Sequence, residues 1–162
     1  MNPFFEQWSM TMTDLNNVDE ILDYAIDLEQ KAVDLYTQIA EKAQNATLKK
    51  VFLGFAGEER GHKAKLEAVK AGKKFVGTAT PVSDLKISDY TNDVVLSENP
   101  TYGDILVFAM KQEKQAFRLY TDLSDRTDNA ELKELFLALA QEEAKHKLRF
   151  EVEYDEYELT EN

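Results

Sequence analysis

Hydrophobic residues recur along most of the chain with a period of about 3.6, which is typical of amphipathic α-helices. Four such stretches are separated by short polar breaks or by segments that contain glycine and proline. They predict helices over residues 18–44, 46–71, 101–124 and 130–157. Each helix would be about 36–42 Å long at the usual rise per residue. The chain is therefore expected to be all-α.

The two halves of this pattern repeat each other. Residues 22–69 align with residues 106–153 at a constant offset of 84, and 19 of the 48 pairs are identical. Chance matching of helix-forming residues would produce mainly Ala, Leu and Lys identities. Here the two histidines of the chain, His62 and His146, occupy equivalent positions. Each repeat is therefore expected to form one helical hairpin.

A long segment separates the two repeats. Residues 72–100 hold two glycines and two prolines, which interrupt regular structure. Such a connection lets the third helix start far from the end of the second, which predicts a four-helix bundle with one crossover. The bundle is expected over residues 18–157, between an N-terminal arm of residues 1–17 and an acidic tail of residues 158–162.

Each predicted helix carries a glutamate in the middle of its apolar stripe. In the second and fourth helices a histidine follows three residues later, on the same helix face. The six residues are Glu29, Glu59, His62, Glu113, Glu143 and His146. Their neighbours along the stripes are Phe, Leu, Ala and Tyr, which disfavours the alternative that they are surface charges. Four glutamates and two histidines are therefore expected to meet in the bundle core.

Carboxylates buried in this way need compensating charge. Each unpaired buried ion costs several kcal/mol, whereas a whole domain is stable by roughly 5–15 kcal/mol. Two divalent metal ions would balance four carboxylates, and two neutral imidazoles would complete the ligand shells. This constellation is characteristic of di-iron and di-manganese carboxylate bundles. The prediction is two divalent metal ions per chain, Fe or Mn, with Glu29 and Glu113 as bridging or terminal ligands.

Four further polar residues flank the six. Tyr36 and Tyr120 lie seven residues after the glutamates of the first and third helices. They would donate hydrogen bonds to the ligands, take part in electron transfer, or pack as ordinary core aromatics. Glu58 and Glu142 would be alternative ligands, acceptors for imidazole N–H groups, or exposed flanking charges. Four phenylalanines are expected to pack around the site and keep it dry: Phe52, Phe55, Phe117 and Phe136.

With these residues identified, the sequence resembles the rubrerythrin branch of the ferritin-like superfamily. The resemblance is carried by the six residues, in particular by the motifs Glu59-Arg-Gly-His62 and Glu143-Ala-Lys-His146, and covers about residues 22–153. It implies a ferritin-like four-helix bundle and a non-haem di-iron centre bound by these residues. It also implies the reduction of hydrogen peroxide.

The chain departs from that family in two respects. Rubrerythrins proper carry a rubredoxin domain whose four cysteines bind the electron-delivering iron, whereas this chain has no cysteine. It would therefore need a separate electron donor. Rubrerythrins also usually carry an extra glutamate one turn beyond the third-helix ligand, where this chain has Ala116. A symmetric six-ligand site, closer to bacterioferritin-type centres, is expected instead.

Composition narrows the classes of partner and location. The 31 acidic and 19 basic residues give a formal net charge of −12, which argues against nucleic acid or an anionic membrane as partner. The lack of cysteine excludes disulfides, Cys-ligated zinc and iron–sulfur clusters. The longest apolar run is far shorter than a membrane span, and the N-terminus does not resemble a secretory signal. A cytoplasmic protein is expected.

The leading functional hypothesis is a redox enzyme that reduces hydrogen peroxide or O₂ in oxidative-stress defence, with electrons from an external donor protein. The first alternative is a ferroxidase or iron-storage protein. The second is a di-manganese protein with catalase-like activity, and a metal-free structural bundle is the non-enzymatic alternative. A homodimer is expected by analogy with the fold.

Overall fold

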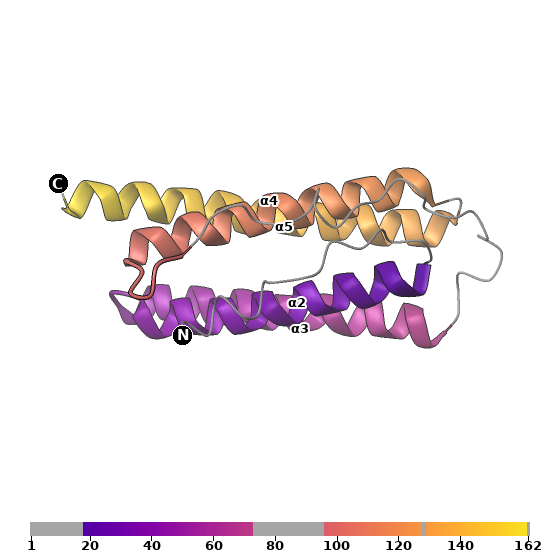
Figure 1. Ribbon diagram of the computed structural model, residues 1–162, viewed down its shortest axis with the longest axis horizontal. Helices are drawn as coiled ribbons and strands as arrows, with labels where there is room; N and C mark the ends of the chain where they lie inside the picture. Colours follow the sequence, from indigo (N-terminus) through magenta and orange to yellow (C-terminus); the bar gives the residue numbers. More distant parts are fainter. Residues whose placement is uncertain (1–17, 73–95, 128, 162) are drawn as a thin grey trace.

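The computed structural model describes residues 18–72, 96–127 and 129–161. In these ranges it has four long helices, α2 (Val18–Lys42), α3 (Ala46–Ala71), α4 (Tyr102–Arg126) and α5 (Ala130–Glu161). The helices α2 and α3 form one antiparallel hairpin, α4 and α5 form another, and the hairpins stack as two layers (Figure 1). The predicted all-α bundle of two helical hairpins is confirmed.

Polar side chains mark the helix starts that the sequence predicted. At the start of α3, Asn45 accepts a hydrogen bond from the backbone N–H three residues on, at 2.9 Å. Thr101 and Asp104 form a capping box at the start of α4, in which each side chain accepts from the other's backbone N–H. Asn129 repeats the role of Asn45 at the start of α5. These caps satisfy backbone groups that would otherwise lack partners.

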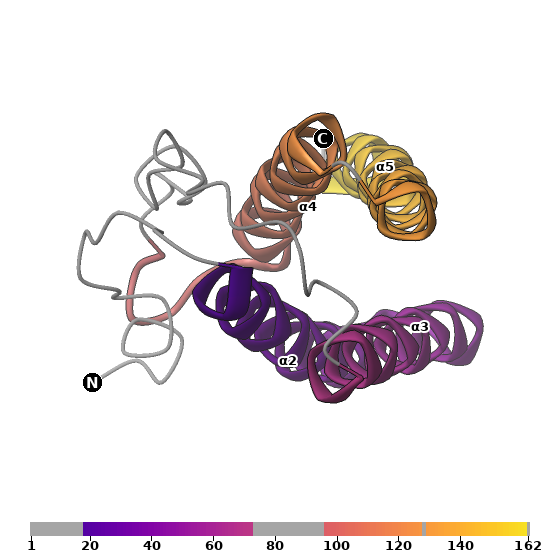
Figure 2. The same cartoon turned by 90° about the vertical axis from the view of Figure 1, so that its right-hand side faces the viewer.

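The directions of the helices explain the long connection between the hairpins. In Figure 1, α3 ends at the right of the bundle and α4 begins at the left. The chain must therefore travel the length of the bundle between them, as a crossover does. Figure 2 shows α2 beside α4, which brings the two hairpins together. The interior of the crossover, residues 73–95, and the N-terminal arm, residues 1–17, lie outside the described residues.

The last helix is longer than the sequence predicted. It continues to Glu161, through most of the segment expected to be an acidic tail. The Tyr157 ring packs edge-on against Tyr102 of α4, with centroids 5.3 Å apart. Thr160 also donates a hydrogen bond to the Tyr157 carbonyl at 2.8 Å. A contact between residues 55 positions apart thus holds the end of α5 against the start of α4.

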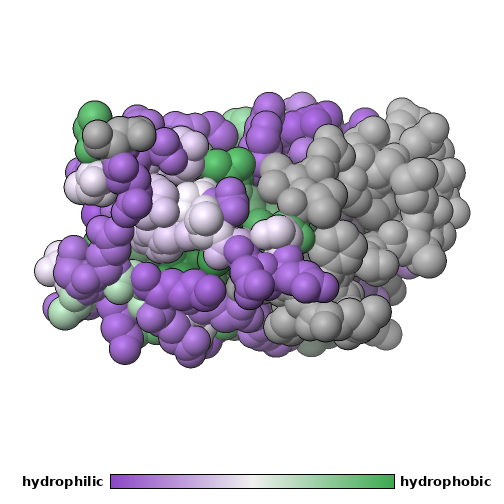
Figure 3. Space-filling model, turned by 60° about the vertical axis from the view of Figure 1, so that its left-hand side comes forward, coloured by the Kyte–Doolittle hydropathy of each residue, from purple (hydrophilic) through white to green (hydrophobic). Residues whose placement is uncertain are grey.

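Two hydrophobic clusters fill the bundle, one on each side of its middle. One contains Leu66 and Phe136, and the other contains Phe52 and Phe150. Hydrophilic side chains cover most of the described surface in Figure 3, where hydrophobic ones show only in small areas. Among the described residues, no helix is both long enough and apolar enough to span a bilayer.

Candidate metal centre

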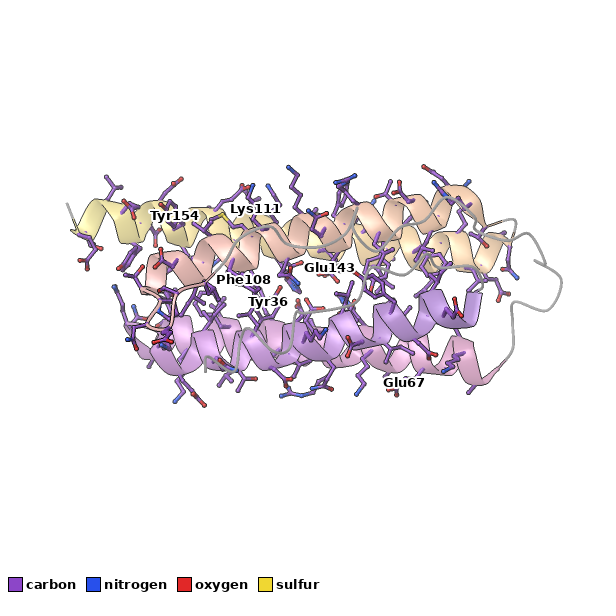
Figure 4. All side chains as sticks on the ribbon, viewed as in Figure 1. Tyr36, Glu67, Phe108, Lys111, Glu143 and Tyr154 are labelled. Carbon is purple, nitrogen blue, oxygen red and sulfur yellow. The ribbon has the colours of Figure 1, made fainter. Side chains whose placement is uncertain are left out.

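The six predicted ligands meet between the two hydrophobic clusters. All four helices contribute, and each side chain is buried, with an exposed fraction between 0 and 5%. They are Glu29 of α2, Glu59 and His62 of α3, Glu113 of α4, and Glu143 and His146 of α5. Figure 4 shows Glu143 on the inner side of its hairpin, facing the other layer. The structure therefore brings all six together in one polar layer.

The donor atoms form two overlapping groups of four. Within each group, one ligand atom from every residue lies within 4.8 Å of the others. Both groups include Glu59 and Glu143. The first group adds Glu29 and His62 of the α2/α3 hairpin, and the second adds Glu113 and His146 of the α4/α5 hairpin. The sequence left open whether Glu29 and Glu113 would bridge. In this arrangement they are terminal, and the two motif glutamates are the bridging candidates.

Both imidazole rings turn Nδ1 towards the shared carboxylates. His62 Nδ1 lies 3.1 Å from Glu59 Oε2 and 3.2 Å from Glu143 Oε1. His146 Nδ1 lies 2.6 Å from Glu59 Oε1 and 3.7 Å from Glu143 Oε2. The nitrogen and oxygen lone pairs of the two motifs therefore converge on the same space.

Several of these atoms are buried without a hydrogen-bond partner. They are Glu59 Oε1, both carboxylate oxygens of Glu113, Glu143 Oε1 and His146 Nδ1. An unsatisfied buried polar group costs about 1–3 kcal/mol, and more when it is charged. Coordination would satisfy all of them, since carboxylate and imidazole donors suit Fe and Mn. The residues present thus fit a centre of two divalent ions, whose charge would equal that of four carboxylates.

Without metal ions, the crowded site holds protons instead. Burial, and then repulsion from Glu143, raise the pKa of Glu29 well above its usual value. The same two causes raise the pKa of Glu113. Burial lowers the pKa of His62, but hydrogen bonds to the surrounding carboxylates outweigh it and raise the pKa to about 12. The surrounding carboxylates, Glu113 first, likewise outweigh burial and raise the pKa of His146. Protons and metal ions therefore compete for this site.

The two tyrosines predicted beside the site have different contacts, although they are equivalent in the repeat. The Tyr120 hydroxyl donates a hydrogen bond to Glu29 Oε1. Burial and the nearby carboxylate charges raise the pKa of Tyr120, so it stays a neutral donor. Tyr36 packs edge-on against the His146 ring, with centroids 6.1 Å apart. One tyrosine thus orients a ligand, and the other packs against one.

The two flanking glutamates also have different contacts, although they are equivalent in the repeat. Glu58 Oε2 lies 2.5 Å from His146 Nε2, although its side chain is 52% exposed. An Nε2–H group that donates to Glu58 leaves Nδ1 free to bind a metal ion. Glu142 instead pairs with Lys145 at 3.1 Å on the surface. Neither glutamate belongs to the donor groups, so the alternative-ligand role is not supported for either.

Sequence reasoning missed a small cavity beside the carboxylates. Its volume is about 20 Å³, and all four ligand glutamates line it, whereas neither histidine does. The other walls come from Leu28, Ala32, Tyr36, Gln112, Gln115 and Ala116. Ala32 and Ala116 are equivalent in the repeat, each three residues after a ligand glutamate. This pair of small residues is the signal that could have predicted the space.

One phenylalanine expected in the core lies outside it. Phe117 is 39% exposed, because it follows Ala116 and points about 100° further around the helix than the core stripe. Phe52 and Phe136 are buried as expected. The Phe55 ring lies against the His146 ring, with centroids 4.3 Å apart. Three of the four phenylalanines therefore pack as predicted.

Comparisons with known proteins identify the family of the chain and proteins of similar structure. The family model described as Rubrerythrin matches residues 20–91 and 104–162. A hypothetical protein from Pyrococcus furiosus is similar in structure, with a TM-score of 0.68 and 28% identity over 86% of this chain and 89% of that chain.

A second similar structure, from Thermotoga maritima, is described as a ferritin-like diiron-carboxylate protein. Its TM-score is 0.72 with 19% identity, over 92% of this chain and 99% of that chain. At this identity the likeness supports the fold, a ferritin-like four-helix bundle. No curated protein sequence matches the chain.

Proposed function

Because the chain belongs to the rubrerythrin family of di-iron carboxylate proteins, we propose that it reduces hydrogen peroxide to water, in oxidative-stress defence, with electrons from a separate donor. The observation that carries this proposal is the small cavity that the four ligand carboxylates line. A water molecule needs about 10–15 Å³, so a cavity of about 20 Å³ excludes all but very small substrates.

In this proposal the chain holds two iron ions. Each would be bound by the terminal glutamate and the histidine of one hairpin, and both would share Glu59 and Glu143. When bound as Fe(II), the two ions would supply the two electrons that convert H₂O₂ and two protons into two water molecules. The protein contributes ligand geometry, exclusion of bulk water and recognition of the oxidant.

The cavity walls favour peroxide over O₂. Gln112 and Gln115 line the cavity, and the Oε1 atom of each is buried without a hydrogen-bond partner. These oxygens can accept hydrogen bonds from the two O–H groups of H₂O₂, whereas O₂ has no hydrogen to donate. Leu28, Ala32 and Ala116 form the aliphatic part of the wall, beside the four ligand carboxylates. Tyr120 holds the Glu29 carboxylate in place at its edge.

Metal analysis tests the site first. Protein purified without chelators is expected to bind two Fe per chain, and both Glu59→Ala and His146→Ala to lower that content. Glu142→Ala is the matched control, since Glu142 pairs with Lys145 on the surface. Unchanged iron in both ligand variants would refute the site. Manganese together with O₂ release from peroxide would identify the catalase-like alternative.

Kinetics tests the reaction. Anaerobically loaded Fe(II) protein is mixed with H₂O₂ or with O₂, and oxidation is followed by absorbance. We expect peroxide to react at least tenfold faster, and Gln112→Leu to reduce that preference. If O₂ reacts as fast and iron accumulates beyond two per chain, the protein is a ferroxidase or storage protein instead.

A further inference from the structure

A groove of about 600 Å³ runs along the outer face of the α4/α5 hairpin. Apolar side chains line it, including Met110, Phe117 and Leu148, and Leu148 is 61% exposed. Four cations surround them: Lys111, Lys114, Arg118 and Lys147. Figure 4 shows Lys111 on the outer side of this hairpin, away from Glu143. We call this feature the α4/α5 groove.

Three of its four cations lack a carboxylate partner. Lys147 pairs with Glu151, which also lines the groove. Within the described part of the chain, no carboxylate oxygen lies within 4 Å of Lys111, Lys114 or Arg118. These three residues occupy two turns of α4, in a chain whose net charge is −12. The α4/α5 groove is therefore a locally positive face on an acidic protein.

The equivalent face of the α2/α3 hairpin has the opposite charge. By the repeat offset of 84, Lys111 corresponds to Asp27 and Arg118 to Asp34. Asp27 pairs with Lys31 at 2.9 Å, and Asp34 accepts a hydrogen bond from Gln30 at 3.0 Å. The repeat therefore does not require cations at these positions, and only the second hairpin presents them unpaired.

The groove lies directly behind the metal centre. Lys114 follows Glu113 in α4, and Lys147 follows His146 in α5. Ligand and groove residues thus alternate around the same helical turns, so about one helix diameter, 10–12 Å, separates the two sites. A redox group docked in the groove would approach the metal centre from the outer side of α4 and α5, which carry the ligands Glu113 and His146.

We propose that the α4/α5 groove docks an acidic electron-carrier protein. This inference rests on the proposed function, because it names the partner that returns electrons to the site. Each one-electron carrier is oxidised once and reduces one Fe(III) to Fe(II), so two carriers restore the centre after each H₂O₂. Opposite charges would speed and orient the encounter, and the exposed Phe117 and Leu148 would supply apolar contact.

Charge argues against a second copy of the chain in this groove. A twofold contact centred on this groove would bring Lys111, Lys114 and Arg118 of both copies into one interface, which concentrates like charges. A head-to-tail contact with the acidic face of α2 would compete with the partners that Asp27 and Asp34 already have. All three cations are exposed and flank a groove of about 600 Å³, which is far larger than a small anion and suits a protein partner better.

The test compares two variants with the same change in charge. One carries Lys111→Glu, Lys114→Glu and Arg118→Glu. The control carries Lys49→Glu, Lys50→Glu and Lys133→Glu, which are exposed lysines outside the groove. The probe is an acidic plant-type [2Fe–2S] ferredoxin. Its binding to each protein is titrated at low and high salt, and its anaerobic electron transfer to the oxidised metal centre is followed by stopped flow.

We expect the groove variant to lose at least tenfold in affinity and in second-order rate at low salt, together with most of the salt dependence. The control variant should keep values close to those of the unmodified protein. Phe117→Ala should weaken binding without changing the salt dependence. Reduction by a small uncharged reductant should be the same in all variants, since the metal centre is intact.

Three results would overturn the proposal. These are equal losses in both charge variants, salt-independent binding by the unmodified protein, or a change of particle size in the groove variant, which would identify a second copy as the occupant. Metal content is measured in parallel. If the chain lacks iron, the proposed function fails, but binding of the ferredoxin still decides whether the groove is a docking site.

Discussion

The two donor groups have the same ligand types but different neighbours. Tyr120 donates a hydrogen bond to Glu29, which is terminal on one position. Glu58 contacts the imidazole of His146, which is terminal on the other. A hydrogen bond donated to a carboxylate weakens the carboxylate's negative charge. A carboxylate that accepts a hydrogen bond from an imidazole N–H makes the ring more basic. Two ions in this centre should therefore differ in affinity.

Replacing Tyr120 tests the first of these contacts. Tyr120→Phe leaves the Glu29 oxygen buried without its donor, which should lower the free energy of unfolding by about 1–3 kcal/mol. Denaturant unfolding of the metal-loaded protein measures the loss. Tyr36→Phe is the matched control, because among the described residues Tyr36 donates no hydrogen bond to a ligand carboxylate. Equal losses in the two variants would contradict the assigned role.

Replacing Glu58 tests the second contact. Glu58→Gln removes the charged acceptor of the His146 N–H, and such outer partners typically contribute 10–100-fold to metal affinity. We expect a loss within about that range in competition titrations against a chelator. Glu142→Gln should have little effect, since Glu142 faces Lys145. A large effect of Glu142→Gln would assign both glutamates to the centre.

The sequence predicted the ligands but not these differences. Glu29 and Glu143 could be predicted as ligands because a charged residue in an apolar stripe requires compensating charge, and the same pattern occurs in both halves of the repeat. Tyr36 and Tyr120 are identical in the repeat, so no sequence pattern distinguishes them. The difference arises from how the hairpins pack, which brings Tyr120 of α4 to Glu29 of α2.

At the scale of single helices, α3 is weakened on its outer face. Gly54, Gly57 and Gly61 are exposed, and a Cβ atom added to any of them would meet nothing within 4 Å. Each glycine inside a helix costs about 0.5–1 kcal/mol relative to alanine. The equivalent positions of α5 hold side chains, for example Ala138. The first hairpin therefore depends more on tertiary packing than the second.

Alanine substitution in α3 should therefore stabilise the protein. Gly54→Ala is expected to raise the free energy of unfolding by about 0.5–1 kcal/mol, without changing metal content. Gly103→Ala is the contrasting variant, because its Cβ would lie 2.9 Å from Tyr157 Cε1. That contact should cancel or reverse the gain. Denaturant midpoints measure both, and a loss in Gly54→Ala would show that the outer face of α3 is covered in the assembled protein.

Helix bounds were predictable where local chemistry sets them. Asn45 and Thr101 start their helices with hydrogen bonds to residues three positions away, so a short window contains the signal. The C-terminal end of α5 is not marked by a local capping signal of this kind in the sequence. It depends on Tyr157 packing against Tyr102 of another helix, which only the tertiary structure shows.

For the molecule as a whole, the metal centre links the two hairpins. Each hydrophobic cluster contains residues of both hairpins, and the donor groups between the clusters also always combine residues of both. Metal binding therefore stabilises the assembled bundle specifically, by mass action on the folded state.

This linkage predicts opposite pH dependences for the two forms. The pKa values of Glu29, Glu113 and His62 are raised in the metal-free protein. Their stabilisation is complete below the unfolded values, 4.5 for the glutamates and 6.5 for histidine, and is lost as the pH rises towards the folded values. The melting temperature of the metal-free protein should therefore fall as the pH rises above about 5.

One group acts in the other direction. Burial raises the pKa of Glu143, but the close neighbours Glu113, His146 and His62 outweigh it and lower the pKa. Its contribution is present above pH 4.5 and is lost only in acid. The stabilisation by metal should increase with pH, because the ligands bind metal deprotonated. Thermal unfolding with and without chelator checks both trends, and a metal-free melting temperature that rises with pH would contradict them.

Sequence alone could not locate the α4/α5 groove. Its cations are dispersed over residues 111–147 within a chain of net charge −12, so composition suggested only an acidic surface. Their common face depends on the register of α4 against α5. The predicted homodimer and cytoplasmic location, by contrast, stay predictions.

The internal repeat also has a consequence for how such a chain can originate. Either hairpin contains one half of the metal ligands, in equivalent positions. A chain of half this length could pair with a copy of itself about a twofold axis and complete the centre, with both ions in identical surroundings. Joining the two copies in one gene releases each from that symmetry. The unpaired cations of α4, the hydrogen bond of Tyr120 and the contact of Glu58 are differences that a symmetric dimer could not carry.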